Sequence, residues 1–183
     1  MSLSVAVPSS DELKERGLQA FRSHDLRGAD EAFGQALNAY RLADNRAGQA
    51  EMLVNLGVVH IQTGGYERAE QELTQARDTF HALERRSEEA QALGNLGTLF
   101  ERSGQPERAG TYYRQAVAIF GELGERENQQ ATLGALTRLQ VGERQWLQSL
   151  FTYEQALAAG KKLTLKQRVF RWLYRILMRL MGL

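Results

Sequence analysis

The stretch NLGVVHIQTGGYERAEQEL, residues 55–73, is followed 40 residues later by a near copy, NLGTLFERSGQPERAGTYY, residues 95–113. The agreement extends beyond both stretches at the same shift, through the pairs Leu53/Leu93, Ala76/Ala116 and Phe80/Phe120. Weaker copies of the pattern precede and follow this pair. A fixed period with constant spacing of small and large residues predicts an array of structural repeats.

Each unit of this array reads as two helices joined by a tight turn. In the second unit, apolar residues recur at helical spacing over 53–61 and again over 69–80. The Gly64-Gly65 pair between them ends the first helix and permits a sharp turn. We expect the small residues Gly57 and Ala69 to let the two helices approach each other closely.

Two further signals mark where helices begin. Ser9 followed by Glu12 forms a capping-box pattern, which predicts the start of the first helix. Pro106 follows the turn of the third unit, and a proline suits the first position of a helix.

The pattern resembles the tetratricopeptide repeat family, in the 40-residue form of the kinesin light chain type. The residues that carry the resemblance are Leu53, Leu56, Gly57, Ala69, Leu73 and Ala76, and again Leu93, Leu96, Gly97, Ala109, Tyr113 and Ala116. The fourth unit departs from the pattern, with Thr137 in the glycine place and Ser149 in the alanine place. Atypical terminal repeats are expected in such arrays, because each has a neighbour on one side only.

The chain is therefore expected to be all-α, an α-solenoid of about four helix-turn-helix repeats followed by a C-terminal amphipathic helix. We expect an N-terminal tail at 1–9, an array at 10–160 and a basic amphipathic helix at 161–183. The expected units of the array are 10–49, 50–89, 90–129 and 130–160.

The resemblance implies a superhelix whose first helices line a concave groove that binds a peptide or a helix of a partner protein. On this basis the candidate partner-binding residues are Val54, Asn55, Val58, Ile61, Gln62, Gln91, Asn95, Thr98, Arg102 and Arg138, with Lys14, Leu18, Arg22 and Glu101 on the same face. Asn55 and Asn95 are the sharpest candidates, because an amide both donates and accepts and can hold the backbone of an extended peptide. The alternative is that these asparagines bond to the end of a neighbouring helix.

No pattern in the sequence predicts catalysis, a cofactor or a metal site. The three histidines, His24, His60 and His81, are not spaced as a ligand set. We expect structural roles for His60, which falls in an aromatic core place, and for His24, which lies near a turn. Glu88 and Glu89 are expected on a solvated helix face, without an apolar pocket that would raise a carboxyl pKa.

Charge divides the chain into two parts. Residues 1–160 contain 16 Lys and Arg against 22 Asp and Glu, a net charge of −6, whereas 161–183 contain seven bases and no acid. This split predicts a body with an attachment device. The absence of cysteine suits a reducing compartment, and the N-terminal residues do not have the pattern of a secretory signal. We therefore expect a cytoplasmic protein, peripheral to the inner face of a membrane if its last helix binds lipid.

The last helix has a basic stripe formed by Arg168, Arg171, Arg175 and Arg179. Nearly all the rest of its circumference is apolar and includes Trp172 and Tyr174. Such a wide apolar arc is not stable in water and has to be covered.

Three covers for this arc remain open. The first is an anionic membrane interface, which suits tryptophan, tyrosine and snorkelling arginines, whereas four arginines argue against a spanning helix. The second is the array itself or a second copy of the chain, with the helix as a cap or oligomerisation element of a larger assembly. The third is the groove of a dedicated protein partner. Nucleic acid is not expected, because the body is acidic and the arginines alternate with bulky aliphatic residues.

Overall fold

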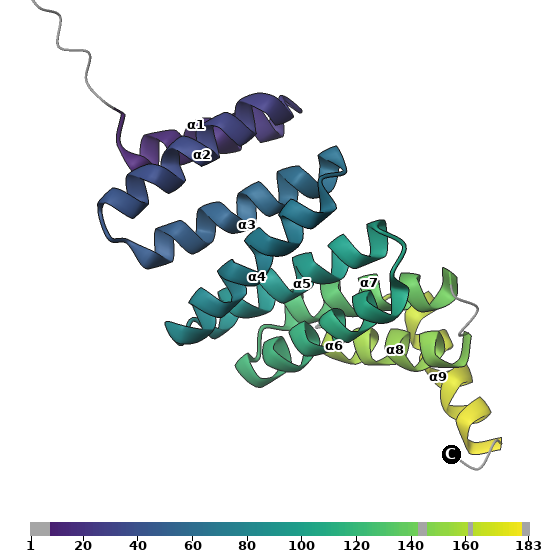
Figure 1. Ribbon diagram of the computed structural model, residues 1–183. Coiled ribbons are helices and arrows are strands. Elements are labelled where there is room, and N and C mark those ends of the chain that lie inside the picture. Colours follow the sequence, from purple (N-terminus) through teal and green to yellow (C-terminus); the bar gives the residue numbers. More distant parts are fainter. Residues whose placement is uncertain (1–7, 143–145, 161–162, 181–183) are drawn as a thin grey trace, which may run out of the picture.

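The computed structural model describes residues 8–142, 146–160 and 163–180, and these ranges contain nine helices and no strand. Figure 1 shows the helices stacked in chain order along a curved array. The helices are α1 (Ser10–Arg22), α2 (Leu26–Leu42), α3 (Arg46–Thr63), α4 (Tyr66–Ala82), α5 (Arg86–Arg102), α6 (Pro106–Leu123), α7 (Arg126–Gly142), α8 (Trp146–Ala159) and α9 (Leu165–Leu180). The predicted all-α solenoid with a final helix is confirmed.

Short turns fold the helices into hairpins, and the hairpins stack on their neighbours. From α1 to α8 each helix packs on the helix before it and the helix after it, and α3 also reaches α5. Contacts are therefore local along the chain, as expected for a repeat array. The last helix, α9, packs on α8.

Small residues recur wherever two helices cross closely. Ala36, Ala76 and Ala116, one per unit, are completely buried. Gly57 lies so close to α4 that a Cβ atom there would come within 2.6 Å of Leu73 Cγ. Gly17 against Phe33 and Gly97 against Tyr113 repeat the same packing in the first and third units, each at 2.5 Å. The expected role of these small residues is confirmed, and it fixes the distance between the two helices of a hairpin.

The turns within the hairpins need a left-handed backbone residue. Gly64 and Gly104 supply it with φ angles of 81° and 74°. In the first unit the same place is taken by His24, at a φ of 62°. A side chain in this region is strained by roughly 1–2 kcal/mol. The turn position expected for His24 is thus confirmed, and it carries a local strain that glycine avoids.

Both predicted helix starts are observed. The side-chain oxygen of Ser9 accepts from the Glu12 backbone N–H at 3.2 Å, and the Glu12 carboxylate accepts from the Ser9 N–H at 2.7 Å. Pro106 is the first residue of α6. The Ser9–Glu12 bonds satisfy backbone donors that a helix start leaves without partners, and Pro106 has no N–H that would need one.

The fourth hairpin differs from the others at the glycine place. Thr137 stands where the first three units have Gly17, Gly57 and Gly97. Its partner in the facing helix, Tyr153, is 36% exposed, whereas the corresponding Tyr113 of the third unit is 3% exposed. The fourth hairpin thus lacks the glycine against which the large residue of the facing helix packs in the other three. The ring of Tyr153 therefore lies at the surface, toward α9.

Candidate functional site

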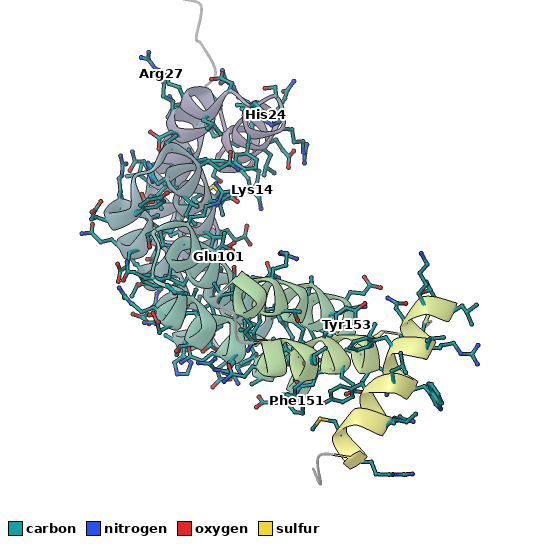
Figure 2. The ribbon with its side chains drawn as sticks, turned by 90° about the vertical axis from the view of Figure 1, so that its right-hand side faces the viewer. Lys14, His24, Arg27, Glu101, Phe151 and Tyr153 are labelled. Atoms are coloured by element: carbon teal, nitrogen blue, oxygen red, sulfur yellow. The ribbon has the colours of Figure 1, made fainter. Side chains whose placement is uncertain are left out.

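The first helices of the hairpins contribute side chains to the hollow side of the curve. Figure 2 shows Lys14 of α1 and Glu101 of α5 on this side. The Lys14 ammonium group lies 2.6 Å from a carboxylate oxygen of Glu51 on α3. This hydrogen bond raises the pKa of Lys14, so the charge of Lys14 is matched by Glu51.

Three of the predicted residues line one cavity of about 480 Å³ on α5 and its neighbours. Gln91, Asn95 and Thr98 come from α5. The remaining lining residues are Ala90, Gly94, Tyr113, Phe120, Asn128, Ala131, Thr132 and Ala135. Amides and hydroxyls thus converge on a floor of small residues, a lining that offers hydrogen bonds without a fixed charge.

A hydrogen-bond chain links this cavity to Glu101. The Tyr113 hydroxyl donates to a Glu101 carboxylate oxygen at 2.7 Å and lies 3.2 Å from the Thr98 hydroxyl. Burial, and then the bond to Glu101, raises the pKa of Tyr113 far above its ordinary value. Tyr113 therefore stays protonated, and its hydroxyl fixes the positions of Thr98 and Glu101.

The other predicted groove residues do not line this cavity. Val54, Asn55 and Val58 are half-buried on α3, and the side chains of Gln62, Arg102 and Arg138 are exposed. One assignment is wrong: Ile61 is 4% exposed and packs in the core with Leu73 and Phe100. The helical register turns Ile61 toward α4, so a partner cannot reach it without unfolding the hairpin.

The predicted asparagines keep their amide groups available. Among the described residues, neither Asn55 nor Asn95 has a side-chain hydrogen bond to another part of the protein. The bond to a neighbouring helix end, considered as an alternative, is not found in the described part of the chain. Both amides lie on partly exposed helix faces, where a ligand backbone could meet them.

The sequence reasoning missed the contribution of α7 to the cavity. Asn128, Ala131, Thr132 and Ala135 form its far wall. The signal was present in the repeat register, because Ala131 and Ala135 stand one period after Gln91 and Asn95. Alanine at both places removes side-chain volume and opens the space that the amides of α5 face.

His60 is buried between two carboxylates, at the place that Phe100 occupies in the next unit. Its Nδ1 lies 2.6 Å from a Glu72 carboxylate oxygen, and its Nε2 lies 3.0 Å from Asp30. In the next unit Phe100 stacks on Tyr112 with ring centroids 5.2 Å apart. A buried histidine bonded to carboxylates thus replaces an aromatic pair, which agrees with the structural role expected for His60.

Glu89 also departs from its expected environment. The expectation of a solvated position is wrong, because Glu89 is 7% exposed. Its carboxylate accepts from Arg86 at 2.9 Å and lies 3.1 Å from Nδ1 of His81. These bonds offset the loss of hydration, and the group holds the turn between α4 and α5. In the described part of the chain no three acidic or histidine side chains converge as metal ligands.

A larger hollow of about 790 Å³ lies along the second helix of the second hairpin. It is lined by Arg46, Glu67, Glu70, Gln71, Thr74, Gln75, Asp78 and Thr79. All of these residues except Arg46 lie on α4, and three of them are acidic. The cavity on α5 is the better candidate for recognition, because side chains of three helices converge on it.

The last helix is held on α8 by an aromatic and an ionic contact. The ring of Phe170 meets Tyr153 edge to face, with centroids 4.7 Å apart. Arg171 lies 3.0 Å from a carboxylate oxygen of Glu154. Figure 2 places Tyr153 at this junction. No described helix combines the length and the apolar character that crossing a bilayer requires.

Stacked helical hairpins whose contacts are local along the chain define an α-solenoid. Residues 92–127 match the family model of the tetratricopeptide repeat. Crystal structures of a Podosopora anserina putative kinesin light chain with nearly identical TPR-like repeats are similar to the chain, one of them at 18% identity and a TM-score of 0.72 over 87% of this chain and 80% of that one. The resemblance to the tetratricopeptide family is confirmed by the match over residues 92–127, and the described part of the chain shares the fold of TPR-like solenoids.

Two further structures share the fold. BtubC (BKLC) from P. vanneervenii has 20% identity and a TM-score of 0.75, over 82% of this chain and 62% of that one. A Rap protein complexed with Competence and Sporulation Factor has 16% identity and a TM-score of 0.73, over 92% of this chain and 47% of that one. The chain thus spans less than two thirds of either protein. No curated protein matches it.

Proposed function

We propose that the chain is a non-enzymatic scaffold that binds an extended segment of a partner protein on its hollow face and is tethered to a membrane surface by α9. The observation that carries the binding role is the cavity at which Gln91, Asn95 and Asn128 meet. The complex of the similar Rap protein with Competence and Sporulation Factor adds support by analogy of fold.

The chemistry of the cavity favours main-chain recognition. Amide side chains bind backbone N–H and C=O groups of an extended peptide whatever its side chains are. Gly94, Ala131 and Ala135 leave room for a backbone to approach. Apolar residues of the ligand would then meet the half-buried Val54 and Val58 on α3.

Selection from a displayed library of random peptides tests this role. The full chain is used as bait, and the affinity of a selected peptide is measured by fluorescence anisotropy. Asn95→Ala and Gln91→Ala each remove one hydrogen bond, so each should weaken binding by roughly 0.5–1.5 kcal/mol, or about 2- to 12-fold. The matched control is Asn38→Ala, because Asn38 is an exposed amide that lines a different cavity, of about 520 Å³, with Arg68 and Gln75.

The comparison between the two sets of variants decides the assignment. The proposed site is supported if the affinity for the selected peptides falls with Asn95→Ala and Gln91→Ala but not with Asn38→Ala. Equal loss with all three variants, or loss with Asn38→Ala alone, would assign recognition to another face of the array.

A further inference from the structure

The structure divides the apolar circumference of α9 into two opposite faces. Half-buried side chains at Gln167, Phe170, Arg171, Tyr174 and Met178 recur at helical spacing and form the docked face, which packs on α8. The opposite face is apolar and open to solvent. It consists of Leu165 at 75% exposed, Val169 at 48%, Trp172 at 62%, Leu173 at 53% and Ile176 at 39%. The helix is thus both a cap of the array and a surface that still lacks a cover.

The charges of α9 are arranged around this free face. Arg171 lies on the docked side and is paired with Glu154. Arg168, Arg175 and Arg179 are exposed along one flank of the free face, and Lys166 is exposed on the other. No acidic residue occurs in 161–183. A cover for this surface has to be apolar in its middle and anionic at its rim.

The rest of the chain does not provide that cover. Residues 1–160 carry a net charge of −6 and could in principle attract the basic helix. However, α9 contacts the array through its docked face, so its free face is left without a partner in the described part of the chain. An interface of anionic lipids has both required properties, because acyl chains accept the apolar face and phosphate groups accept the arginines. Helical spacing places Trp172 at the edge of the face, next to the flank of Arg168 and Arg179, and tryptophan favours the headgroup region.

We propose that α9 binds an anionic lipid surface with its free face while its docked face stays packed on α8. This inference deepens the proposed tether and rests on it. The array is then fixed at the membrane in one orientation, because lipid and α8 contact opposite sides of the same helix. The Tyr153 ring, 36% exposed on α8, is the surface on which Phe170 of the docked face packs.

Vesicle binding of the full chain gives the first measurement. The probe is flotation with phosphatidylcholine vesicles that contain about 30 mol% phosphatidylserine, compared with pure phosphatidylcholine. Trp172→Ser with Ile176→Ser should lower partitioning at least about 10-fold. Arg168→Gln with Arg175→Gln and Arg179→Gln should remove most of the preference for the anionic vesicles, about 10- to 100-fold. The control is Leu42→Ser, at the end of α2 far from α9 in Figure 1, where an apolar side chain is 92% exposed.

A distance measurement separates a docked helix from a free tether. The chain has no cysteine, so cysteines introduced at Ala158 on α8 and Lys166 on α9, both exposed, carry the only spin labels. We expect the same narrow distance distribution with and without anionic vesicles. A broad or longer distribution on vesicles that still bind the chain would overturn the docked orientation and leave the tether intact.

Two other results would also count against the inference. If the chain does not bind vesicles of either composition, both the proposed membrane tether and the docked orientation on the membrane are wrong. If Trp172→Ser with Ile176→Ser halves the mass measured by light scattering in the absence of lipid, the free face is the interface of a second copy, and the lipid assignment is overturned.

Discussion

Gly97 offers the sharpest test of the packing argument. A Cβ atom at this place would lie 2.5 Å from Tyr113 Cδ1 and 2.6 Å from Cε1. The ring cannot move aside easily, because Tyr113 is 3% exposed and its hydroxyl is bound to Glu101. Gly97→Ala therefore has to shift α5 relative to α6. A matched glycine, Gly94, lies one turn earlier on the same helix and has nothing within 4 Å of its Cβ position.

The two substitutions differ only in what the new methyl group meets. Replacing glycine by alanine inside a helix stabilises by about 1 kcal/mol through helix propensity. Overpacking in a filled core destabilises by about 1–3 kcal/mol, and a rigid ring places Gly97 at the upper end. We expect Gly94→Ala to gain about 1 kcal/mol and Gly97→Ala to lose about 1–2 kcal/mol net. The difference between the variants is therefore about 2–3 kcal/mol.

Urea denaturation followed by circular dichroism at the helix band measures this difference. Both the urea midpoint and the slope of the unfolding free energy against urea concentration have to be compared. A repeat array can lose its cooperativity when one unit is weakened, and the slope then changes. If Gly97→Ala were as stable as Gly94→Ala, the glycine would not be setting the distance between α5 and α6. The recurring glycines would then not set the spacing within the hairpins, and Thr137 would not explain the exposure of Tyr153.

Three further substitutions test other parts of the fold. His24→Gly should stabilise the protein by about 0.5–1 kcal/mol in the same denaturation assay, because glycine adopts the left-handed turn without strain; a loss of stability would show that the imidazole makes a compensating contact. Ser9→Ala should cost about 1 kcal/mol by removing the capping box, visible as faster hydrogen exchange in α1 and unchanged exchange in α5. Glu72→Gln tests the buried pair: burial raises the pKa of Glu72 above its ordinary value of 4.5, so the folded wild type binds this proton more tightly than the unfolded chain does. The stability of the wild type relative to Glu72→Gln should therefore fall as the pH rises from about 4.5 toward neutrality; a pH-independent difference would contradict the raised pKa.

The array could be predicted from the sequence because its information is local and repeated. Gly57 and Gly97, or Ala76 and Ala116, each solve the same packing problem with the same residue. Because the repeat period is 40 residues, the same small residue appears at the same place in two successive units of the sequence. The caps at Ser9 and Pro106 depend only on neighbours within one turn, so they too could be read without coordinates.

The candidate site could be predicted only in part, because it depends on which units face each other. The repeat register identified Gln91 and Asn95 as polar places on the first helix of a unit. It did not show that Ala131 and Ala135 open a cavity opposite them, since that requires the position of α7 relative to α5. The same limit explains Ile61 and Glu89, whose burial depends on contacts with helices of other hairpins or with a turn.

We infer that the division of α9 into two faces is linked to one departure from the repeat. In the first three units a glycine receives the large residue of the facing helix, and the hairpin closes on itself. With Thr137 in that place, the fourth hairpin leaves the Tyr153 ring at its surface, and Phe170 packs against it. One side of α9 is thereby fixed on α8, and helical spacing then turns Trp172 and Ile176 outward. We predict that the residue that makes the fourth unit a poor repeat also lets this hairpin hold the final helix. Thr137→Gly should weaken that contact, because the ring gains a place inside the hairpin. A shift of the label distance between α8 and α9 in this variant would show that the irregular unit orients the last helix, whereas an unchanged distance would contradict it.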